Sequence, residues 1–398
     1  MIDKFICGGG FAAFIFPFSA AAQLFQPLGI GFQGGERQGP YSQPRMHVEG
    51  DKLYVCTAKG LYVRDLTDDG SDWLSAGFEG IPLQDYVRRG DDMLALRYNE
   101  GGTFLLLSHD SGQTYEDVTP DVFRLRDHEH LPSLAQHPTD PSILLLSSMF
   151  KGVFRSTDFG QTWERLTYVF YGNGSASFVG FHPAQPSILY HCGEGDFFEP
   201  HFYVSYDDGQ KWVNHSDDLM FPGDNCVHRP SFHPTQSERW LVGGEGCVYL
   251  SDDNGQTWTC QNYLDDKARS AYWYFSAFDT ERPETVYLAG GVYTSFSNRI
   301  RLMCSTDGGR SWLPSQEMTT EERTLVNDLQ QYHDRLIVYT ESGVYTVAKA
   351  DLIEQSINSV HTMTADGGPT ATFDLQGRRL AEPRRSINLK NHRKYLKK

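Results

Sequence analysis

Two glutamates, each flanked by glycines, are the side chains best placed by their sequence to do chemistry. Glu194 and Glu245 both stand at the centre of a Gly-Glu-Gly triplet. Glycine is typical of exposed loops, and two carboxyl groups about 5–10 Å apart are the arrangement that hydrolyses glycosidic bonds. We therefore predict Glu194 and Glu245 as a catalytic pair. The alternative is that each triplet is only a solvated turn.

Further residues near these glutamates suit the binding of a sugar. Aromatic faces can stack on the apolar faces of sugars, while acidic and basic groups bond hydroxyls and carboxylates. An Arg beside a His also suits elimination at a uronate, with Arg neutralising the carboxylate and His or Tyr acting as the base. The predicted substrate-binding residues are Asp196, His228, Arg229, Arg269, Tyr272 and Trp273. For His228 a purely structural role is the alternative.

Composition argues against other classes of ligand. The formal net charge is −16, although residues 370–398 hold nine Lys or Arg against Asp374 and Glu382. A body this acidic repels phosphate backbones, so we expect no nucleic-acid partner. No Cys or His spacing matches a metal site, and we expect no metal and no cofactor. We expect a monomer.

One eight-residue pattern fixes the elements that must position these side chains. Ser-x-Asp-x-Gly-x-x-aromatic recurs five times, beginning at Ser108, Ser156, Ser205, Ser251 and Ser305. Asp can accept backbone N–H groups within its own turn, and Gly supplies a positive φ. Degenerate copies at Leu66 and Val347 extend the series, with spacings of 42 to 54 residues. A period in the forties with about four strands per unit indicates the blades of a β-propeller.

This pattern resembles the Asp box, or BNR repeat, of sialidases, sortilin-type receptors and xyloglucan-active propellers. The resemblance implies an all-β fold, a single seven-bladed β-propeller of four-stranded antiparallel blades. It also implies that the boxes lie on the periphery and carry no catalysis. The sialidase Arg-Ile-Pro element is not found, and the blade sequence Gly-Val-Phe-Arg-Ser-Thr-Asp is closer to xyloglucanase-type propellers. We carry over no catalytic residue from either family.

The position of the boxes predicts on which rim of the propeller each loop lies. If each box joins the third strand to the fourth, the loops between strands two and three and the crossovers between blades lie on the opposite rim. The predicted site residues fall in those loops, which typically carry function. His137, His182 and His233 each precede a Pro and an apolar strand, so we predict that they are turn residues and not metal ligands.

The ends of the chain differ from its middle. Residues 1–22 read as a signal peptide, 23–361 as the propeller, and 362–398 as a basic tail that resembles type IX sorting signals. We therefore expect a secreted or cell-surface protein. The six cysteines beyond Cys7 permit disulfides of undetermined pairing or buried free thiols. Outside the strands, residues 319–331 look helical.

Three functions remain open from the sequence. The first is a propeller that acts on or binds glycans, as a glycoside hydrolase if it is an enzyme. The second is a propeller that binds protein partners without catalysis. The third is a polysaccharide lyase.

Overall fold

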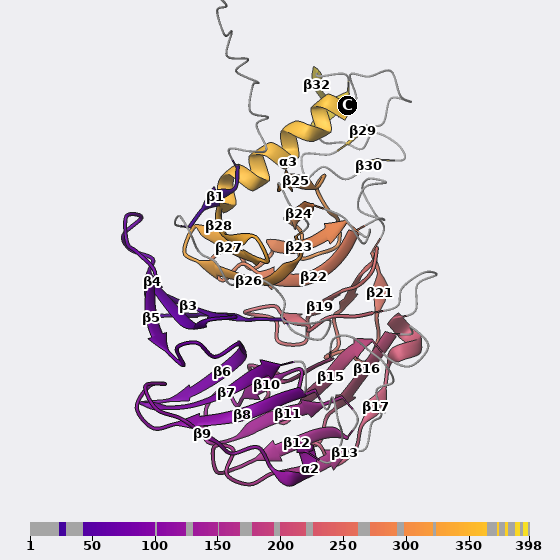
Figure 1. Cartoon of the computed structure of the whole chain (residues 1–398). Helices are drawn as coiled ribbons and strands as arrows, with labels where there is room; N and C mark the ends of the chain where they lie inside the picture. Colours follow the sequence, from indigo (N-terminus) through magenta and orange to yellow (C-terminus); the bar gives the residue numbers. More distant parts are fainter. Residues whose placement is uncertain are drawn as a thin grey trace, which may run out of the picture.

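The computed structural model is a ring of seven antiparallel sheets, each with four strands. The structure describes residues 24–28, 43–99, 102–124, 130–149, 151–167, 177–194, 200–219, 226–261, 271–292, 298–320 and 324–363, with short stretches of the tail at 372–373, 379–380, 387–390 and 393–396. Figure 1 shows the blades following one another around the ring in sequence order. The predicted seven-bladed propeller is confirmed.

Each of the first six blades is built from four consecutive strands. Blades 1 to 3 consist of β2 (Met46–Glu49), β3 (Lys52–Thr57), β4 (Gly60–Asp65) and β5 (Leu74–Gly77); β6 (Leu83–Arg89), β7 (Asp92–Asn99), β8 (Gly102–Ser108) and β9 (Glu116–Asp117); and β10 (Leu134–Gln136), β11 (Leu144–Ser148), β12 (Gly152–Ser156) and β13 (Glu164–Thr167). Blades 4 to 6 consist of β14 (Ser177–Phe181), β15 (Leu189–Glu194), β16 (Pro200–Ser205) and β17 (Val213–Asn214); β18 (Ser231–Phe232), β19 (Trp240–Gly243), β20 (Val248–Ser251) and β21 (Thr259–Cys260); and β22 (Ala271–Phe278), β23 (Val286–Val292), β24 (Arg299–Ser305) and β25 (Gln316–Thr319). Two short helices, α2 (Asp121–Arg124) and η2 (Ser216–Leu219), follow blades 2 and 4.

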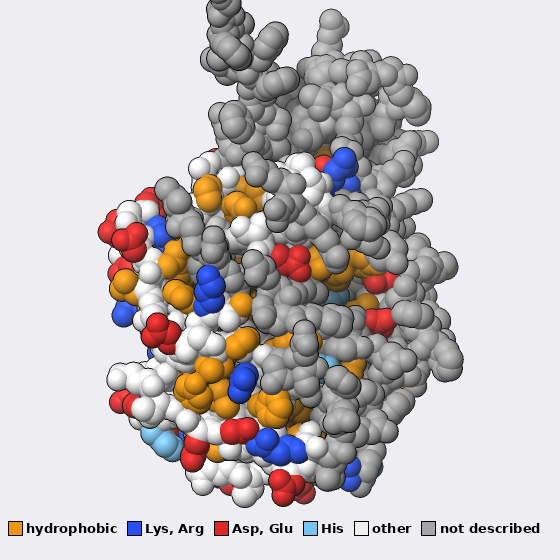
Figure 2. All heavy atoms as spheres, viewed as in Figure 1, with side chains coloured by type: hydrophobic (Ala, Val, Ile, Leu, Met, Phe, Trp, Pro, Cys, Tyr) orange, Lys and Arg blue, Asp and Glu red, His pale blue; other side chains and the backbone are white. Residues whose placement is uncertain are grey.

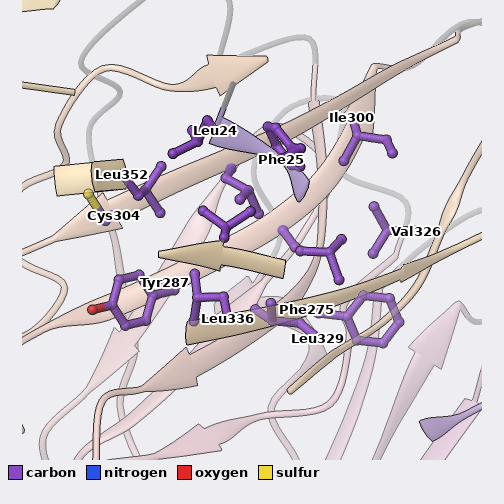
Figure 3. Close-up of a cluster of buried hydrophobic side chains, with 14 of the residues drawn as sticks. Leu24, Phe25, Phe275, Tyr287, Ile300, Cys304, Val326, Leu329, Leu336 and Leu352 are labelled. Carbon is purple, nitrogen blue, oxygen red and sulfur yellow. The ribbon is translucent and has the colours of Figure 1, made fainter. Parts of the chain in front are cut away.

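Blade 7 is closed by the beginning of the described chain. It contains β26 (Val326–Tyr332), β27 (Arg335–Thr340) and β28 (Gly343–Ala348), and its outer position is taken by β1 (Gln26–Pro27), which pairs with β28. Leu24 and Phe25 enter the apolar cluster between blades 6 and 7, beside Val326 and Leu336 (Figure 3). Trp73 of blade 1 donates its indole N–H to the carbonyl of Leu28 at 2.8 Å. The ring is thus closed by strand pairing and by packing.

The long helix α3 (Lys349–Met363) begins directly after β28, where the other blades turn towards a fourth strand. Its Leu352 and Ile353 pack on the same cluster, outside the last blades (Figures 1 and 3). The prediction of a helix over residues 319–331 is wrong, because this stretch ends β25 and forms most of β26. Its polar residues mimic helical periodicity, whereas Val326 and Leu329 point to the core.

All five Asp boxes form the same turn between the third and fourth strands. The Ser hydroxyl accepts the N–H of the box Gly at 2.7–2.9 Å, and the Asp carboxylate accepts the N–H four residues on at 2.8–2.9 Å. The box glycine has φ between +76° and +88°, as predicted. A Cβ at Gly160 would lie 2.5 Å from Leu94 of the preceding blade, so the same glycine also allows neighbouring blades to pack.

The three turn histidines replace an Asx turn. Nδ1 of His182 accepts the N–H groups of Ala184 and Gln185 at 3.2 and 2.9 Å, and His137 and His233 do the same in their own blades. In blade 6 a carboxylate oxygen of Asp279 accepts the equivalent N–H groups at 2.9 and 3.1 Å. The prediction that these histidines are turn residues is confirmed.

Both predicted states of the cysteines, a disulfide and buried free thiols, occur in the structure. Cys247 and Cys260 form a disulfide that joins the third and fourth strands of blade 5. Cys56, Cys192, Cys226 and Cys304 are buried free thiols.

The tail contains a second small sheet of four short strands, separate in pairing from the blades. They are β29 (Thr372–Phe373), β30 (Arg379–Leu380), β31 (Ile387–Lys390) and β32 (Arg393–Leu396), in the order β30-β29-β31-β32. No helix in the described part of the chain is long and apolar enough to cross a membrane.

Candidate functional site in the central channel

The innermost strands of the seven blades bring equivalent positions together around the channel. Strand registers within the blades place one residue of each inner strand, or a residue one or two positions before it, at the same level. We call this set the channel ring. Its members, from blade 1 to blade 7, are Arg45, Asp85, Ser133, Phe178, Arg229, Phe275 and Asp328.

Side chains of the channel ring meet across the channel and close it at this level. Arg229 of blade 5 forms an ion pair with Asp328 of blade 7. The guanidinium of Arg45, from blade 1, lies 4.6 Å from the ring centroid of Phe178 and 5.6 Å from that of Phe275. The channel therefore has a floor, made by groups from opposite blades.

A cavity of about 590 Å³ lies on one side of this floor. Its walls come from the inner strands, and its lining extends from Arg45 and Arg229 to Glu49 and Gly90 near the turns after those strands. These turns belong to the same rim as the Asp boxes. Arg45 and Glu49 are four positions apart along an extended strand, so the cavity is about 13 Å deep. Its volume is within the range of small-molecule sites. We had expected the site on the other rim.

The walls hold two hydrogen-bonded clusters. Nε2 of His47 lies 2.8 Å from the carboxylate of Asp85, which also accepts the N–H of Tyr86. Burial favours the neutral form of His47, but the hydrogen bond and charge of Asp85 outweigh it and raise the pKa of His47 above 6.5. In the second cluster, Glu49 accepts the Tyr86 hydroxyl at 2.6 Å and Arg88 at 3.1 Å.

Asp85 and Asp328 sit at the same kind of backbone irregularity. The register shifts between Leu83 and Asp85 in blade 2, and between Val326 and Asp328 in blade 7. At each bulge the carboxylate accepts the N–H of the following residue at 2.9 Å. Bulges re-aim side chains, and here they turn two acids into the channel. A charged residue at or near the start of the inner strand in blades 7, 1 and 2 was the sequence signal for this site, and Arg229 is the only member of the channel ring that we predicted from the sequence.

The predicted pair Glu194 and Glu245 lies on the other side of the floor. Glu194 ends β15 and bridges to Cys226, the neighbouring Val227 bridges to Gly244, and Glu245 bridges to Tyr272. Two strand spacings thus separate the two glutamate backbones, about 10 Å. Both side chains are half-buried. The glycines before Glu245 have a packing role, because a Cβ at Gly243 would lie 2.0 Å from the carbonyl oxygen of Trp273.

Of the other predicted site residues, His228, Tyr272 and Trp273 lie beside the segment that ends in Glu245, because the carbonyls of Gly243 and Gly244 accept the N–H groups of His228 and Trp273 at 3.0 Å and Glu245 bridges to Tyr272. Arg229 belongs to the channel ring and lines the cavity. His228 is 1% exposed and its ring lies 4.4 Å from that of Tyr274, which stacks on Tyr272 at 5.3 Å. Trp273 is fully buried in the core between blades 5 and 6. Asp196 and Arg269 lie outside the described residues. Among the described residues no group of three or more His, Cys, Asp or Glu is arranged to hold a metal ion.

Comparison with known proteins supports the repeat and the fold. A family model described as sortilin, neurotensin receptor 3 (Sortilin-Vps10) matches residues 104–220. A probable oligoxyloglucan-reducing end-specific xyloglucanase of Neosartorya fischeri is 25% identical over 219 residues, which are 50% of this chain and 25% of that protein. This chain therefore spans about a quarter of that relative's length.

Solved structures are similar at the level of the fold. The GH74 xyloglucanase from Xanthomonas campestris matches with a TM-score of 0.60 at 17% identity, over 82% of this chain and 54% of that one. A structure of YCF48 bound to D1 peptide matches with a TM-score of 0.51 at 15% identity, over 77% of this chain and 94% of that one. The chain is a seven-bladed Asp-box β-propeller, similar to GH74 xyloglucanases and to YCF48.

Proposed function

We propose that this propeller binds a glycan in the cavity of its central channel. The observation that carries the proposal is the cavity itself, which ends at the buried side chains of the channel ring and has walls of charged and amide side chains around aromatic rings. Glu49, Arg88 and Gln136 offer acceptors and donors for hydroxyl groups, while Phe178 and Tyr190 offer apolar faces. The similarity to xyloglucanases supports a carbohydrate ligand.

Hydrolysis by Glu194 and Glu245 is a separate enzymatic proposal, because this pair lies on the other side of the floor from the cavity. Their backbone separation of about 10 Å is compatible with an inverting pair, whose carboxyl groups stand about 6.5–9.5 Å apart. Tyr272, which bridges to Glu245, would then contact the substrate. Asp196 and Arg269 remain substrate-binding residues predicted from the sequence alone. The lyase alternative draws instead on Arg229, with His47 and Tyr190 as the His and Tyr of the cavity that interact electrostatically with it.

A glycan panel tests binding and turnover together. The full chain is incubated with plant and host oligosaccharides, and binding, new reducing ends and the absorbance of unsaturated uronates are measured. Glycan binding without turnover in the wild type would contradict both enzymatic proposals. If there is hydrolysis, Glu194→Gln and Glu245→Gln should abolish it, whereas Glu164→Gln on an exposed outer strand should not. Absence of binding to every glycan would contradict the proposal.

A protein ligand is the second candidate. The similarity to the structure of YCF48 bound to D1 peptide supports it, because the match extends over 94% of that chain. Binding of peptides in the absence of any glycan binding would replace the first proposal by this one.

We also propose that the protein is exported. The basis is the sequence of residues 1–22, with residues 362–398 as a sorting signal after the propeller of residues 23–361. N-terminal sequencing of protein recovered outside the expressing cell should begin at Gln23. A protein that stays inside the cell with Met1 intact would contradict the proposal.

A further inference from the structure

The channel ring contains one cation that its acids do not neutralise. Asp328 is 1% exposed on its side chain and is engaged by Arg229, by the N–H of Met46 at 3.2 Å and by the N–H of Leu329. Asp85 is engaged by His47 and Tyr86. Each carboxylate of the ring therefore already has a cationic or hydrogen-bonding partner other than Arg45.

Arg45 lies on the floor of the cavity with no partner of its own among the described residues. It is 3% exposed, and its Nη1 atom is buried without a hydrogen bond. Its guanidinium forms none of the ion pairs in the described part of the chain, and only the faces of Phe178 and Phe275 lie against it. Buried charges in proteins are nearly always paired and hydrogen-bonded, because desolvating them is costly.

The groups around Arg45 make the binding of an anion to its guanidinium more favourable. Burial, followed by repulsion from Arg229, lowers the pKa of Arg45 to about 10, and Asp328 and Asp85 oppose the shift only in part. The guanidinium therefore stays charged at neutral pH. A guanidinium presents a planar fork of donors that matches a carboxylate in two parallel hydrogen bonds.

From these observations we infer that the glycan of the channel cavity ends in a carboxylated sugar, whose carboxylate is bound by Arg45 at the floor. This inference rests on the proposed function and names the substrate class for it. Because the channel ring closes the floor, the cavity admits the end of a chain and not a strand that passes through. A terminal uronate or aldonate satisfies both conditions.

The walls above Arg45 favour a sugar acid over a peptide carboxylate. Glu49, Arg88 and Gln136 lie three or four residues nearer the rim than the channel ring, where the hydroxyl groups of the terminal sugar and its neighbour would lie. A sugar hydroxyl both donates and accepts, so it can bond the carboxylate, the guanidinium and the amide at this level, whereas a peptide N–H only donates and a peptide carbonyl only accepts. A peptide ligand is an outcome that the test must distinguish.

Calorimetric titration of the full chain tests the inference with matched ligands. The probes are trigalacturonate, its methyl ester, the neutral trisaccharide cellotriose, and a short peptide with a free or an amidated C-terminus. We expect trigalacturonate to bind about tenfold to a hundredfold more tightly than its methyl ester, the range for a hydrogen bond to a charged group. Arg45→Gln should abolish this difference, and Arg45→Lys should restore only part of it.

Two controls separate binding from folding. Arg155→Gln removes an arginine that is paired with Asp208 on the Asp-box rim, outside the cavity, and should leave the preference intact. The unfolding midpoint of each variant shows whether it is folded. If Arg45→Gln does not fold, the Arg45→Lys variant decides the question through its reduced preference.

The outcomes separate this inference from the function on which it rests. Equal binding of the acid, its ester and cellotriose would overturn the carboxylate inference and keep glycan binding. Binding of the free peptide terminus alone would overturn both, and so would binding of none of the probes. An unchanged preference in a folded Arg45→Gln variant would overturn the role of Arg45.

Discussion

The Asp-box rim and the channel ring are both made of equivalent positions, yet they differ in what they repeat. Five boxes form the same hydrogen bonds, with the same residue types and distances that agree within 0.2 Å. The seven positions of the channel ring hold two arginines, two aspartates, two phenylalanines and a serine. Repetition builds the scaffold, where each blade needs the same turn. Divergence at equivalent positions creates an asymmetric site at the centre of a nearly symmetric ring.

The largest effect should come from removing a ring acid. Asp328→Asn leaves Arg229 without its ion pair beside Arg45, so we expect the free energy of unfolding to fall by about 3–5 kcal/mol. Urea unfolding measures this change. Asp217→Asn, at an exposed position of η2, should have almost no effect. A loss below about 1 kcal/mol for Asp328→Asn would show that the ring is not a coupled charge network.

A single box should matter less. Ser156→Ala removes the hydroxyl that accepts the N–H of Gly160 and donates to Asp158, and we expect a loss of about 1–2 kcal/mol. Because the boxes repeat, Ser251→Ala should cost the same within experimental error when both are compared in urea. Clearly different losses at Ser156 and Ser251 would contradict the equivalence of the boxes.

Removal of Arg45 should change stability in the opposite direction. Arg45→Met replaces an unpaired buried guanidinium by an apolar side chain of similar length, so we expect stability to rise by about 1 kcal/mol in the absence of ligand. The same denaturant series measures it. A destabilised Arg45→Met variant would mean that Arg45 is a structural member of the ring and not a binding group held at a cost.

The smallest effects should be those of pH, with opposite signs in the two regions. Burial lowers the pKa of His182 below 6.5, so its contribution to stability is present above about pH 6.5 and is lost as pH falls. The pKa of His47 is raised, so its contribution is present below about pH 6.5 and is lost as pH rises through the folded value. The free energy of unfolding, measured from pH 5 to pH 8, should therefore fall towards acid pH because of His182 and towards alkaline pH because of His47.

Substitutions of His182 and His47 test which residue causes the fall in stability at the acid limb and at the alkaline limb of this pH profile. His182→Asp copies the turn of Asp279 and should flatten the acid limb, whereas His47→Gln should flatten the alkaline limb. In His47→Gln the remaining charged groups around that position are Asp85, Glu49, Arg45, Arg229 and Asp328. Unchanged pH profiles in both variants would contradict the assignment.

The sequence predicted the features that depend on neighbours along the chain. An Asp box is complete within eight residues, and so the fold, the blade count and the rim of the boxes followed from it. The histidine turns were predictable for the same reason.

The channel ring could not be predicted in the same way. Arg45, Arg229 and Asp328 lie in three different blades, and only the closed ring brings them together. In addition, the bulges at Asp85 and Asp328 interrupt the simple alternation that would show which side chains face the channel. The prediction of a helix over residues 319–331 treated their polar side chains as the exposed face of a helix. On an inner strand, polar side chains can instead face the channel.

The closure of blade 7 has a consequence for how the molecule is made. Gln26 pairs with Thr346, so β1 must wait for β28, about 320 residues later in the chain, before it has a partner. Contacts this distant along the chain slow folding, because the loop-closure entropy is lost before the contact is gained. Until β1 and β28 pair, each has an unpaired strand edge, which is prone to associate with other chains. Ring closure is therefore the folding step at which association with another chain competes most directly with the native pairing.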